Sequence, residues 1–418
     1  MNVKNTKTDP ADSKLVSFPF LLFCIFALTR PIFTMAYFED QGAFGLKYFE
    51  IYGIGSSILI LAAPFFSFRR LHLNATFGLI LFFCFYSALS LVWGGSTRDT
   101  LRFILPFTVF FASVYCFENV RQIRVILILL IISFIVPIAG SAAAIFLGHT
   151  FSKLVWHTGI MRYKGLFSGT HSLAHSMFIF IFISLLYLLI TKELNINKSK
   201  IFNFMIYILI ALACFNVYKS VTRTVFLGVM VLMGVYLFFR KKYIHLAVVG
   251  LAFAWFLITS ETVHKMLFDI VDPIQGKEEL GQVGSGRLGA WRLILIDFFK
   301  HPFEVQMAGL GVGNITQGKG GIGAPHNDLL SLLTSFGYVG FFLYLCFNLS
   351  YVLDLLKARV PYDIKYLYLA FMLAVMAMNL ASNSYITRFE LGQYLFMLLG
   401  FSYFLTKENF EKASGNTQ

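Results

Sequence analysis

The chain has 418 residues, of which 58% are hydrophobic and 13% are charged, and its mean hydropathy is +0.73. Soluble domains are only about 45–50% apolar and about 25% charged, so this composition excludes an ordinary soluble protein and predicts an all-α polytopic membrane protein. The formal net charge is +13. The Lys and Arg residues stand in short clusters between apolar runs, and we therefore expect no nucleic-acid partner.

Apolar runs occur along nearly the whole chain. A bilayer core about 30 Å thick requires roughly 20 apolar residues in a helix. This length predicts about twelve transmembrane helices in a single integral membrane domain, 1–418. The expected spans lie near residues 15–37, 51–67, 75–94, 102–118, 124–147, 171–191, 201–219, 222–239, 243–260, 329–352, 365–386 and 389–406. The first run is too long for a signal-peptide core, and no small-x-small cleavage site follows it, so we expect it to remain as a span.

Positive charges mark every second connection between these runs. The clusters are Lys4, Lys7 and Lys14; Arg69 and Arg70; Arg121 and Arg124; Lys192, Lys198 and Lys200; Arg240, Lys241 and Lys242; Lys357, Arg359 and Lys365; and Lys407 and Lys412. Short loops rich in Lys and Arg stay in the cytoplasm. The alternation therefore predicts two cytoplasmic termini, a small outer loop at 148–170 and a large outer loop at 261–328.

Both outer loops contain basic residues that the topology does not require. The first has Arg162 and Lys164 and no acidic residue, which favours an anionic ligand or an interface. In the second, the apolar residues of 287–300 fall on one helical stripe and predict an amphipathic helix on the membrane surface. The stripe consists of Leu288, Trp291, Leu295, Phe298 and Phe299. Ser285 is expected to cap this helix and Pro302 to end it.

Arg287 stands at the start of this expected helix, where its charge opposes the helix dipole. An anion bound at the exposed backbone N–H groups would explain that position. The alternative is an arginine that extends to lipid phosphates.

His326 directly precedes the tenth span, with Asn327 or Asp328 as the natural N-cap. The positive helix end favours neutral imidazole, which suits a general base; alternatively, His326 is only an interfacial residue of the capping turn.

Three further positions attract attention. Arg223 enters the eighth span, where an ionisable residue is costly and is therefore a functional candidate. Arg30 lies within the first span, and the following Pro31 predicts a local break that exposes it. His171 and His175 are one helical turn apart, but no carboxylate or third ligand lies near, so we expect no metal site.

All five cysteines lie in apolar runs without a CxxC spacing, which predicts neither disulfides nor a thiolate metal site.

The order of these motifs resembles the bacterial O-antigen ligase and O-antigen polymerase family. The similar segments are Arg162-Tyr-Lys-Gly-Leu-Phe167, Thr222-Arg-Thr224 and the Ser-Gly-Arg…Trp…Gly-Leu-Gly-Val-Gly…His-Asn-Asp pattern at 285–328. The resemblance implies a GT-C-like membrane glycosyltransferase that uses an undecaprenyl-pyrophosphate-linked glycan donor at the periplasmic face of the bacterial inner membrane. The implied acceptor is lipid A–core for a ligase and a carrier-linked glycan for a polymerase.

The same resemblance implies roles for individual residues. Arg223 and Arg287 match the pyrophosphate-binding arginines of the family, and Arg162 and Lys164 match more loosely. His326 matches the histidine that activates the acceptor hydroxyl, with Asn327, Asp328 and Arg292 in supporting positions. The outer loops contain no acidic cluster, so we expect a metal-independent reaction without a cofactor.

Two other functions remain open on the sequence. A flippase or secondary transporter of lipid-linked oligosaccharides would need ionisable groups near the middle of several helices, and these are scarce. In a non-catalytic scaffold of a polysaccharide assembly complex, the ordered outer Arg and His residues would be superfluous. Ligase and polymerase share the same donor, and the sequence does not separate them.

Overall fold

The computed structural model describes residues 17–43, 46–62, 74–117, 119–149, 153–155, 161–196, 199–259, 287–313, 326–382 and 385–414. Helices dominate these residues. Their only strands form two short antiparallel pairs, β1 (Gly42–Ala43) with β2 (Leu46–Lys47) and β3 (Lys153–Val155) with β4 (Met161–Tyr163). The predicted all-α class is confirmed.

A helix coincides with each predicted span. These helices are α1 (Phe18–Phe33), α3 (Tyr48–Ala62), α4 (Ala75–Leu89, continued by the 3₁₀ helix η3, Ser90–Trp93), α5 (Thr97–Tyr115), α6 (Val120–Phe146), α7 (Thr170–Glu193), α8 (Lys200–Ser220), α9 (Arg223–Phe239), α10 (Tyr243–Thr259), α14 (Asp328–Lys357), α15 (Tyr362–Ala381) and α16 (Phe389–Ser402). Six of them are long and apolar enough to cross a membrane: α4 with η3, α6, α7, α8, α14 and α15. The others are shorter or carry more charge, so the number of spans stays a prediction.

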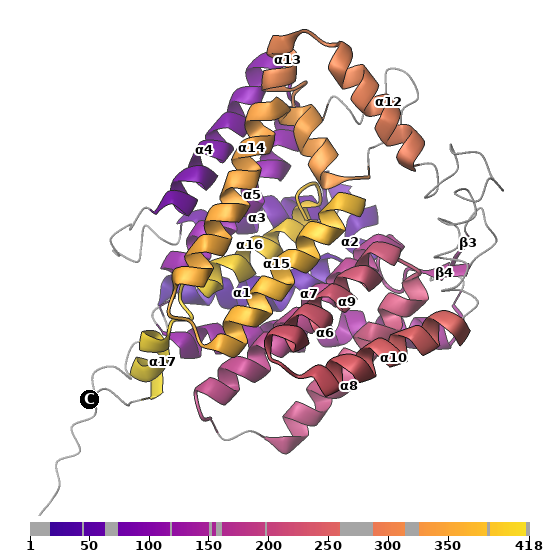
Figure 1. Cartoon of the computed structure of the whole chain (residues 1–418), viewed down its shortest axis with the longest axis vertical. Coiled ribbons are helices and arrows are strands. Elements are labelled where there is room, and N and C mark those ends of the chain that lie inside the picture. The colour runs from indigo at the N-terminus through magenta and orange to yellow at the C-terminus, as the bar shows by residue number, and fades with distance from the viewer. Residues whose placement is uncertain are drawn as a thin grey trace, which may run out of the picture.

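Four more helices lie outside the predicted spans: α2 (Ala36–Asp40), α12 (Arg287–Lys300), α13 (Phe303–Ala308) and α17 (Lys407–Ser414). In Figure 1, α12 lies at the upper right of the bundle, the β3–β4 pair lies at its right edge at about mid-height, and α17 lies at its lower left. We call the end that carries β4 and the first residues of α7, α9, α14 and α16 the site end.

Helix α7 forms the centre of the bundle. In its apolar segment, 89% of the residues are buried, as expected for a helix that is hydrophobic on all sides. Around it, α16 packs mainly against α5, α15 against α9, and α1 against α6. Because α7 is held on several sides, its first turn is a fixed point to which the connections at the site end are attached.

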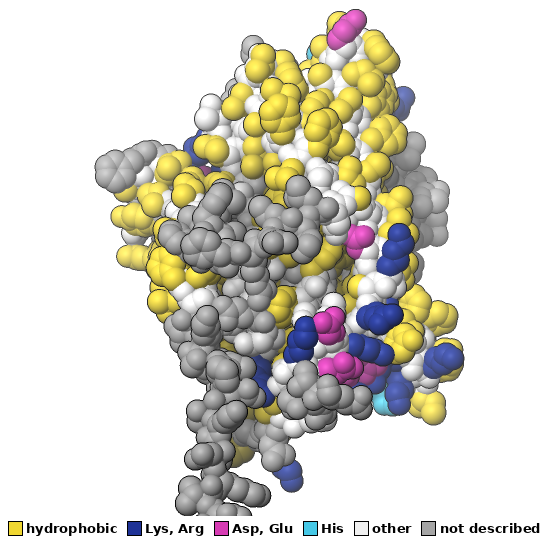
Figure 2. Space-filling model, turned by 90° about the vertical axis from the view of Figure 1, so that its left-hand side faces the viewer, with side chains coloured by type: hydrophobic (Ala, Val, Ile, Leu, Met, Phe, Trp, Pro, Cys, Tyr) yellow, Lys and Arg dark blue, Asp and Glu magenta, His cyan; other side chains and the backbone are white. Residues whose placement is uncertain are grey.

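The outer surface of the bundle is apolar. Figure 2 shows hydrophobic side chains over most of the described upper part of one face, with Lys, Arg, Asp and Glu gathered below. Large side chains such as Ile58, Phe85 and Leu349 are more than half exposed. Contiguous apolar surface of this kind is avoided in water and suits contact with acyl chains. The protein is therefore membrane-embedded.

Helix α14 bends at Gly337, whose φ of 63° interrupts the helix. The bend leaves two carbonyls of α14 available, and the glycine-rich segment 309–313 uses both. Leu310 N–H donates to the Thr334 carbonyl at 2.9 Å, and Gly311 N–H donates to the Ser335 carbonyl at 3.0 Å. A Cβ on Gly337 would collide with the backbone at Met307. The bend thus fixes α13 against α14.

One local prediction was wrong. Helix α1 continues through Pro31, and Arg30 is fully buried instead of exposed, because α1 packs against α6 and α3 at this level. Helix α12, by contrast, has the predicted bounds and ends before Pro302. Within the predicted stripe, Phe298 is buried, Trp291 and Leu295 are half-buried and Phe299 is exposed. The Phe298 ring lies edge-on to Tyr338 of α14, which places this part of the stripe against the bundle. Ser285 and the side chain of Leu288 lie outside the described residues.

Candidate functional site

Arg223 is the first residue of α9, and its side chain is half-buried. A tight turn separates it from α8, with Val221 in the left-handed region (φ 52°) and Thr222 as the N-cap. An arginine at this position opposes the helix dipole, whereas a structural arginine is favoured in the last turn. Arg223 thus stands at the start of the helix, as the sequence predicts.

Arg162 of β4 holds the turn that precedes Arg223. Its side chain is buried, its Nε donates to the Ser220 carbonyl at 3.0 Å, and its Nη2 donates to the Thr222 hydroxyl at 3.3 Å. The last carbonyls of a helix lack intrahelical donors and carry partial negative charge, which explains this attachment to the end of α8. The structure therefore brings Arg162 to the residues directly before Arg223. Lys164 follows in the loop to α7, where it is half-buried.

His326, Asn327 and Asp328 have three different environments. Asn327 is the N-cap of α14: its Oδ1 accepts from Leu330 N–H at 2.9 Å, and its Nδ2 donates to the Leu380 carbonyl at 2.8 Å. His326 is exposed and adopts a left-handed backbone (φ 47°). Such a backbone is uncommon for a residue other than glycine and draws attention to the position. The capping role belongs to Asn327, which leaves the His326 side chain at the surface.

Asp328 is fully buried and attaches α14 to the segment before α16. Its carboxylate accepts hydrogen bonds from Tyr385 N–H at 3.0 Å, Ile386 N–H at 3.3 Å and the Thr387 hydroxyl at 2.6 Å. Hydrogen bonds to a charged acceptor are the strong ones. The position of residues 385–387 is therefore coupled to the start of α14, two residues after His326.

The first turn of α7 connects these two segments. The Thr222 hydroxyl donates to the Thr170 carbonyl at 3.4 Å, which ties the Arg223 turn to α7. Arg388, the N-cap of α16, donates from Nη1 to the Ser172 hydroxyl at 2.8 Å. Residues 385–388 thus link Asp328 to the same turn of α7. The structure brings the Arg223 segment and the His326–Asp328 segment to one place.

Arg388 is a candidate that sequence reasoning missed. The signal was present, because Thr387-Arg388 precedes the last apolar run on the predicted outer side as Thr222-Arg223 precedes the eighth. Arg223 and Arg287 are first residues of helices, and Arg388 is an N-cap. Three helices therefore begin with positive charge, where a bound anion would be favourable. The side chain of Arg287 lies outside the described residues, and Arg292 is exposed on α12.

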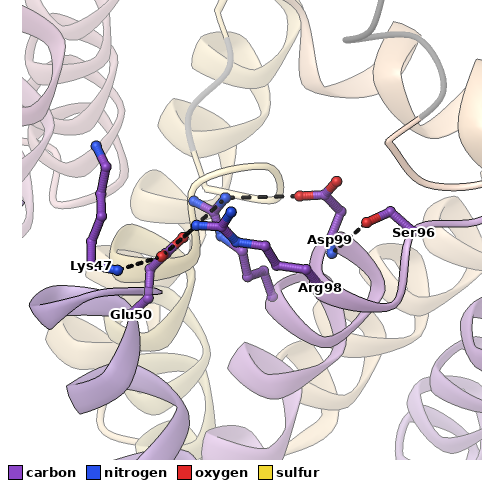
Figure 3. Close-up of polar contacts among 6 residues, drawn as sticks. Lys47, Glu50, Ser96, Arg98 and Asp99 are labelled. Atoms are coloured by element: carbon purple, nitrogen blue, oxygen red, sulfur yellow. Dashed lines mark hydrogen bonds and ion pairs between the residues drawn. The ribbon is translucent and has the colours of Figure 1, made fainter. Parts of the chain in front are cut away.

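A second group of arginines is already neutralised. Figure 3 shows Glu50 of α3 facing Arg98 of α5. The Nη2 atom of Arg98 lies 2.9 and 2.6 Å from the two carboxylate oxygens of Glu50. Arg102 lies 3.5 Å from Glu50 and 3.8 Å from Asp99. These arginines and their acidic partners stabilise the ends of α3 and α5.

The histidine pair of α7 does not form a metal site with its described neighbours. His175 is fully buried, and its Nδ1 lies 3.3 Å from the Tyr385 hydroxyl. Within the described ranges, no group of three or more His, Cys, Asp and Glu residues could hold a metal ion. His175 therefore packs against Tyr385, in the segment 385–388.

A model of the O-antigen ligase family matches residues 207–345. This segment is similar to the O-antigen ligase domain. It covers about a third of the chain and includes Arg223, Arg287 and the His326–Asp328 segment, whereas Arg162, Lys164 and Arg388 lie outside it. No curated protein matches the chain. The match confirms the resemblance to the O-antigen ligase and polymerase family and supports a glycosyltransferase-like role in polysaccharide biosynthesis for this membrane-embedded protein.

Proposed function

We propose that the protein is a metal-independent glycosyltransferase of the inner membrane that transfers a glycan from an undecaprenyl-pyrophosphate carrier at the periplasmic face. The acceptor is lipid A–core in a ligase or a carrier-linked glycan in a polymerase. The observation that carries this proposal is the attachment of two segments of the O-antigen ligase domain to one turn of α7. One segment supplies a cation and the other an exposed imidazole.

The positive charges of the arginines match the negative charge of the lipid pyrophosphate that leaves in the reaction. Cleavage of the bond between the glycan and the carrier releases a lipid pyrophosphate, on which negative charge develops. Arg223 and Arg287 bind its oxygens in this proposal, because guanidinium binds phosphate in a bidentate manner and stays charged. Arg388 adds a third positive charge at the same turn of α7. Arg162 acts mainly by holding residues 220–222. Lys164 and Arg292 add positive charge in this proposal.

His326 serves as the general base. It takes the proton from the acceptor hydroxyl, the hydroxyl oxygen attacks the anomeric carbon, and the bond to the pyrophosphate oxygen breaks. A positioned general base contributes about 10²–10⁴-fold to such a step. Asn327 supports this role because it caps α14 and relieves His326 of any capping function, and Asp328 holds the neighbouring segment.

Transfer in a defined system tests the proposal. The purified protein is placed in vesicles with carrier-linked glycan and either lipid A–core or a second carrier-linked glycan as acceptor, and products are measured by mass spectrometry. We expect transfer to one of the two acceptors. No transfer to either, by folded protein with an intact donor, would refute the proposal. In a deletion strain, loss of all long chains with unchanged carrier-linked polymer indicates a ligase, and capping with a single repeat indicates a polymerase.

A further inference from the structure

A basic patch lies at the end of α14 that is remote from the site end. Its four members are Lys357 in the last turn of α14, Arg359 just beyond that helix, Lys365 in the first turn of α15 and Lys407 at the start of α17. Two contacts hold these segments together. Lys407 N–H donates to the Arg359 carbonyl at 2.7 Å, and the Lys365 ammonium donates to the Leu356 carbonyl at 2.8 Å. In Figure 1, α17 accordingly lies at the lower end of the bundle.

Two of the four basic residues stabilise α14 itself. Lys357 lies in its last turn, and Lys365 donates to a carbonyl of the same turn, so both charges complement the negative end of the helix dipole. Arg359 lies beyond the helix and is exposed. Lys407 is exposed as well and begins α17, where its charge opposes the dipole. The helices therefore do not explain the charges of Arg359 and Lys407.

The carboxylates nearest to the patch in the sequence are bound to other groups. They are Asp354, which accepts from Asn74, Thr76 and Tyr403; Asp363, which pairs with Lys192 and Arg240; and Glu408, which pairs with Lys412. Within the part of the chain that the structure describes, Arg359 and Lys407 form no ion pair. Their positive charges are thus available at the surface.

An exposed apolar surface adjoins the patch. The Lys407 Nζ lies 5.3 Å from the centre of the Tyr362 ring, and 65% of Tyr362 is exposed. Leu349, Leu353 and Leu356 of α14 are also exposed, and their spacing of four and three residues places them on one face that leads to the patch. Tyrosine and basic residues at the border of such a surface are typical of the level of lipid head groups.

We propose that the patch binds the phosphate of an anionic phospholipid in the inner leaflet. Arg359 and Lys407 bind the phosphate oxygens, and the exposed face of α14 receives an acyl chain. The predicted topology places this end of the bundle at the cytoplasmic leaflet, whose anionic lipids attract Lys and Arg at the surface. The site shares no residue with the proposed transfer reaction and lies at the opposite end of α14 from His326, so it does not depend on that reaction.

Thermal unfolding of the purified protein in a neutral detergent tests this site with three probes. Phosphatidylglycerol carries acyl chains and a net negative charge, phosphatidylcholine carries acyl chains and a phosphate without net charge, and inorganic phosphate carries no chains. We expect phosphatidylglycerol alone to raise the Tm of the wild type by several degrees. Lys407→Gln should lose at least half of this shift, and the double variant Arg359→Gln/Lys407→Gln should lose nearly all of it.

The matched control is Lys412→Gln, which removes one positive charge from the same helix, but a charge that is paired with Glu408. It should keep the phosphatidylglycerol shift. All these variants replace exposed side chains, so their Tm without lipid should stay near that of the wild type. A full shift in the double variant, no shift in the wild type, or an equal shift with phosphatidylcholine or inorganic phosphate would each overturn the proposal. An equal loss in Lys412→Gln and Lys407→Gln would also overturn it, because net charge alone would then explain the effect.

Discussion

The carboxylate of Asp328 accepts a hydrogen bond from the Thr387 hydroxyl at 2.6 Å, although the two residues are 59 positions apart. This contact joins the start of α14 to the segment before α16. Arg388 then reaches the first turn of α7 through Ser172. The position of His326 is thus coupled to α7 through these hydrogen bonds. Variants of these residues distinguish a role in the transfer reaction from a role in holding the helices together.

The first prediction concerns His326. His326→Ala should lower transfer by about 10²–10⁴-fold, the contribution of a general base, while abundance and donor binding stay near wild type. The matched control is Asn327→Ala, which removes the N-cap and should lower the free energy of unfolding by about 1 kcal/mol. Transfer rates and thermal unfolding of both purified variants are the measurements. A folded His326→Ala protein with wild-type turnover would remove His326 from the mechanism.

The second prediction concerns the cations. Arg223→Ala and Arg287→Ala should each weaken use of the carrier-linked donor strongly, and lysine at either position should restore it only in part because it lacks the bidentate fork. Donor titrations of the transfer rate measure this effect. Arg98→Ala is the control, since Arg98 is already bonded to Glu50. Full activity of a normally expressed Arg223→Ala or Arg287→Ala variant would assign that arginine a structural or lipid-facing role.

The third prediction tests whether Arg162 holds the turn between α8 and α9 or contacts the substrate directly. Arg162 bonds the residues before Arg223, so Arg162→Ala should lower both thermal stability and transfer. Arg162→Lys should recover little, because one ammonium group cannot replace two donors in fixed directions. We compare Tm and transfer rate in the same preparations. Reduced transfer at an unchanged Tm would instead place Arg162 in direct contact with the substrate.

The fourth prediction concerns Asp328. Its replacement by Asn weakens three hydrogen bonds to residues 385–387, and each bond to a charged acceptor contributes about 1.5–3 kcal/mol. Asp328→Asn should therefore be much less stable than Thr387→Val, which removes a single bond. A double-mutant cycle by thermal unfolding gives the coupling between the two residues. Additive effects would show that the Asp328–Thr387 contact does not hold the segment.

The fifth prediction concerns topology. The alternating basic clusters predict that loop 261–328 is periplasmic and that both termini are cytoplasmic. A membrane-impermeant thiol reagent applied to intact spheroplasts should label Lys277→Cys and leave Lys198→Cys unlabelled. The native cysteines are first replaced by Ser or Ala. Labelling of Lys198→Cys without labelling of Lys277→Cys would invert the predicted orientation.

The sequence alone determined the features that follow from local composition and periodicity. Apolar runs of sufficient length predicted a helix at every expected span, because backbone groups in a bilayer must be satisfied within the segment. The helix 287–300 and the capping of α14 also followed from local signals, namely a proline after the helix and an Asn before it. The motifs around Arg223, Arg287 and His326 were sufficient to indicate the resemblance to the O-antigen ligase family that the match over 207–345 supports.

Only the tertiary structure decided which of these residues share a site and which charges have partners. The attachment of Arg162 to Ser220, of Asp328 to Thr387 and of Arg388 to Ser172 joins segments far apart in the chain. No local pattern encodes such pairs, since they depend on which helices pack together. For the same reason Arg30 is buried, although Pro31 predicts a local break that exposes it: packing of α1 against α3 and α6 outweighs the local effect of the proline.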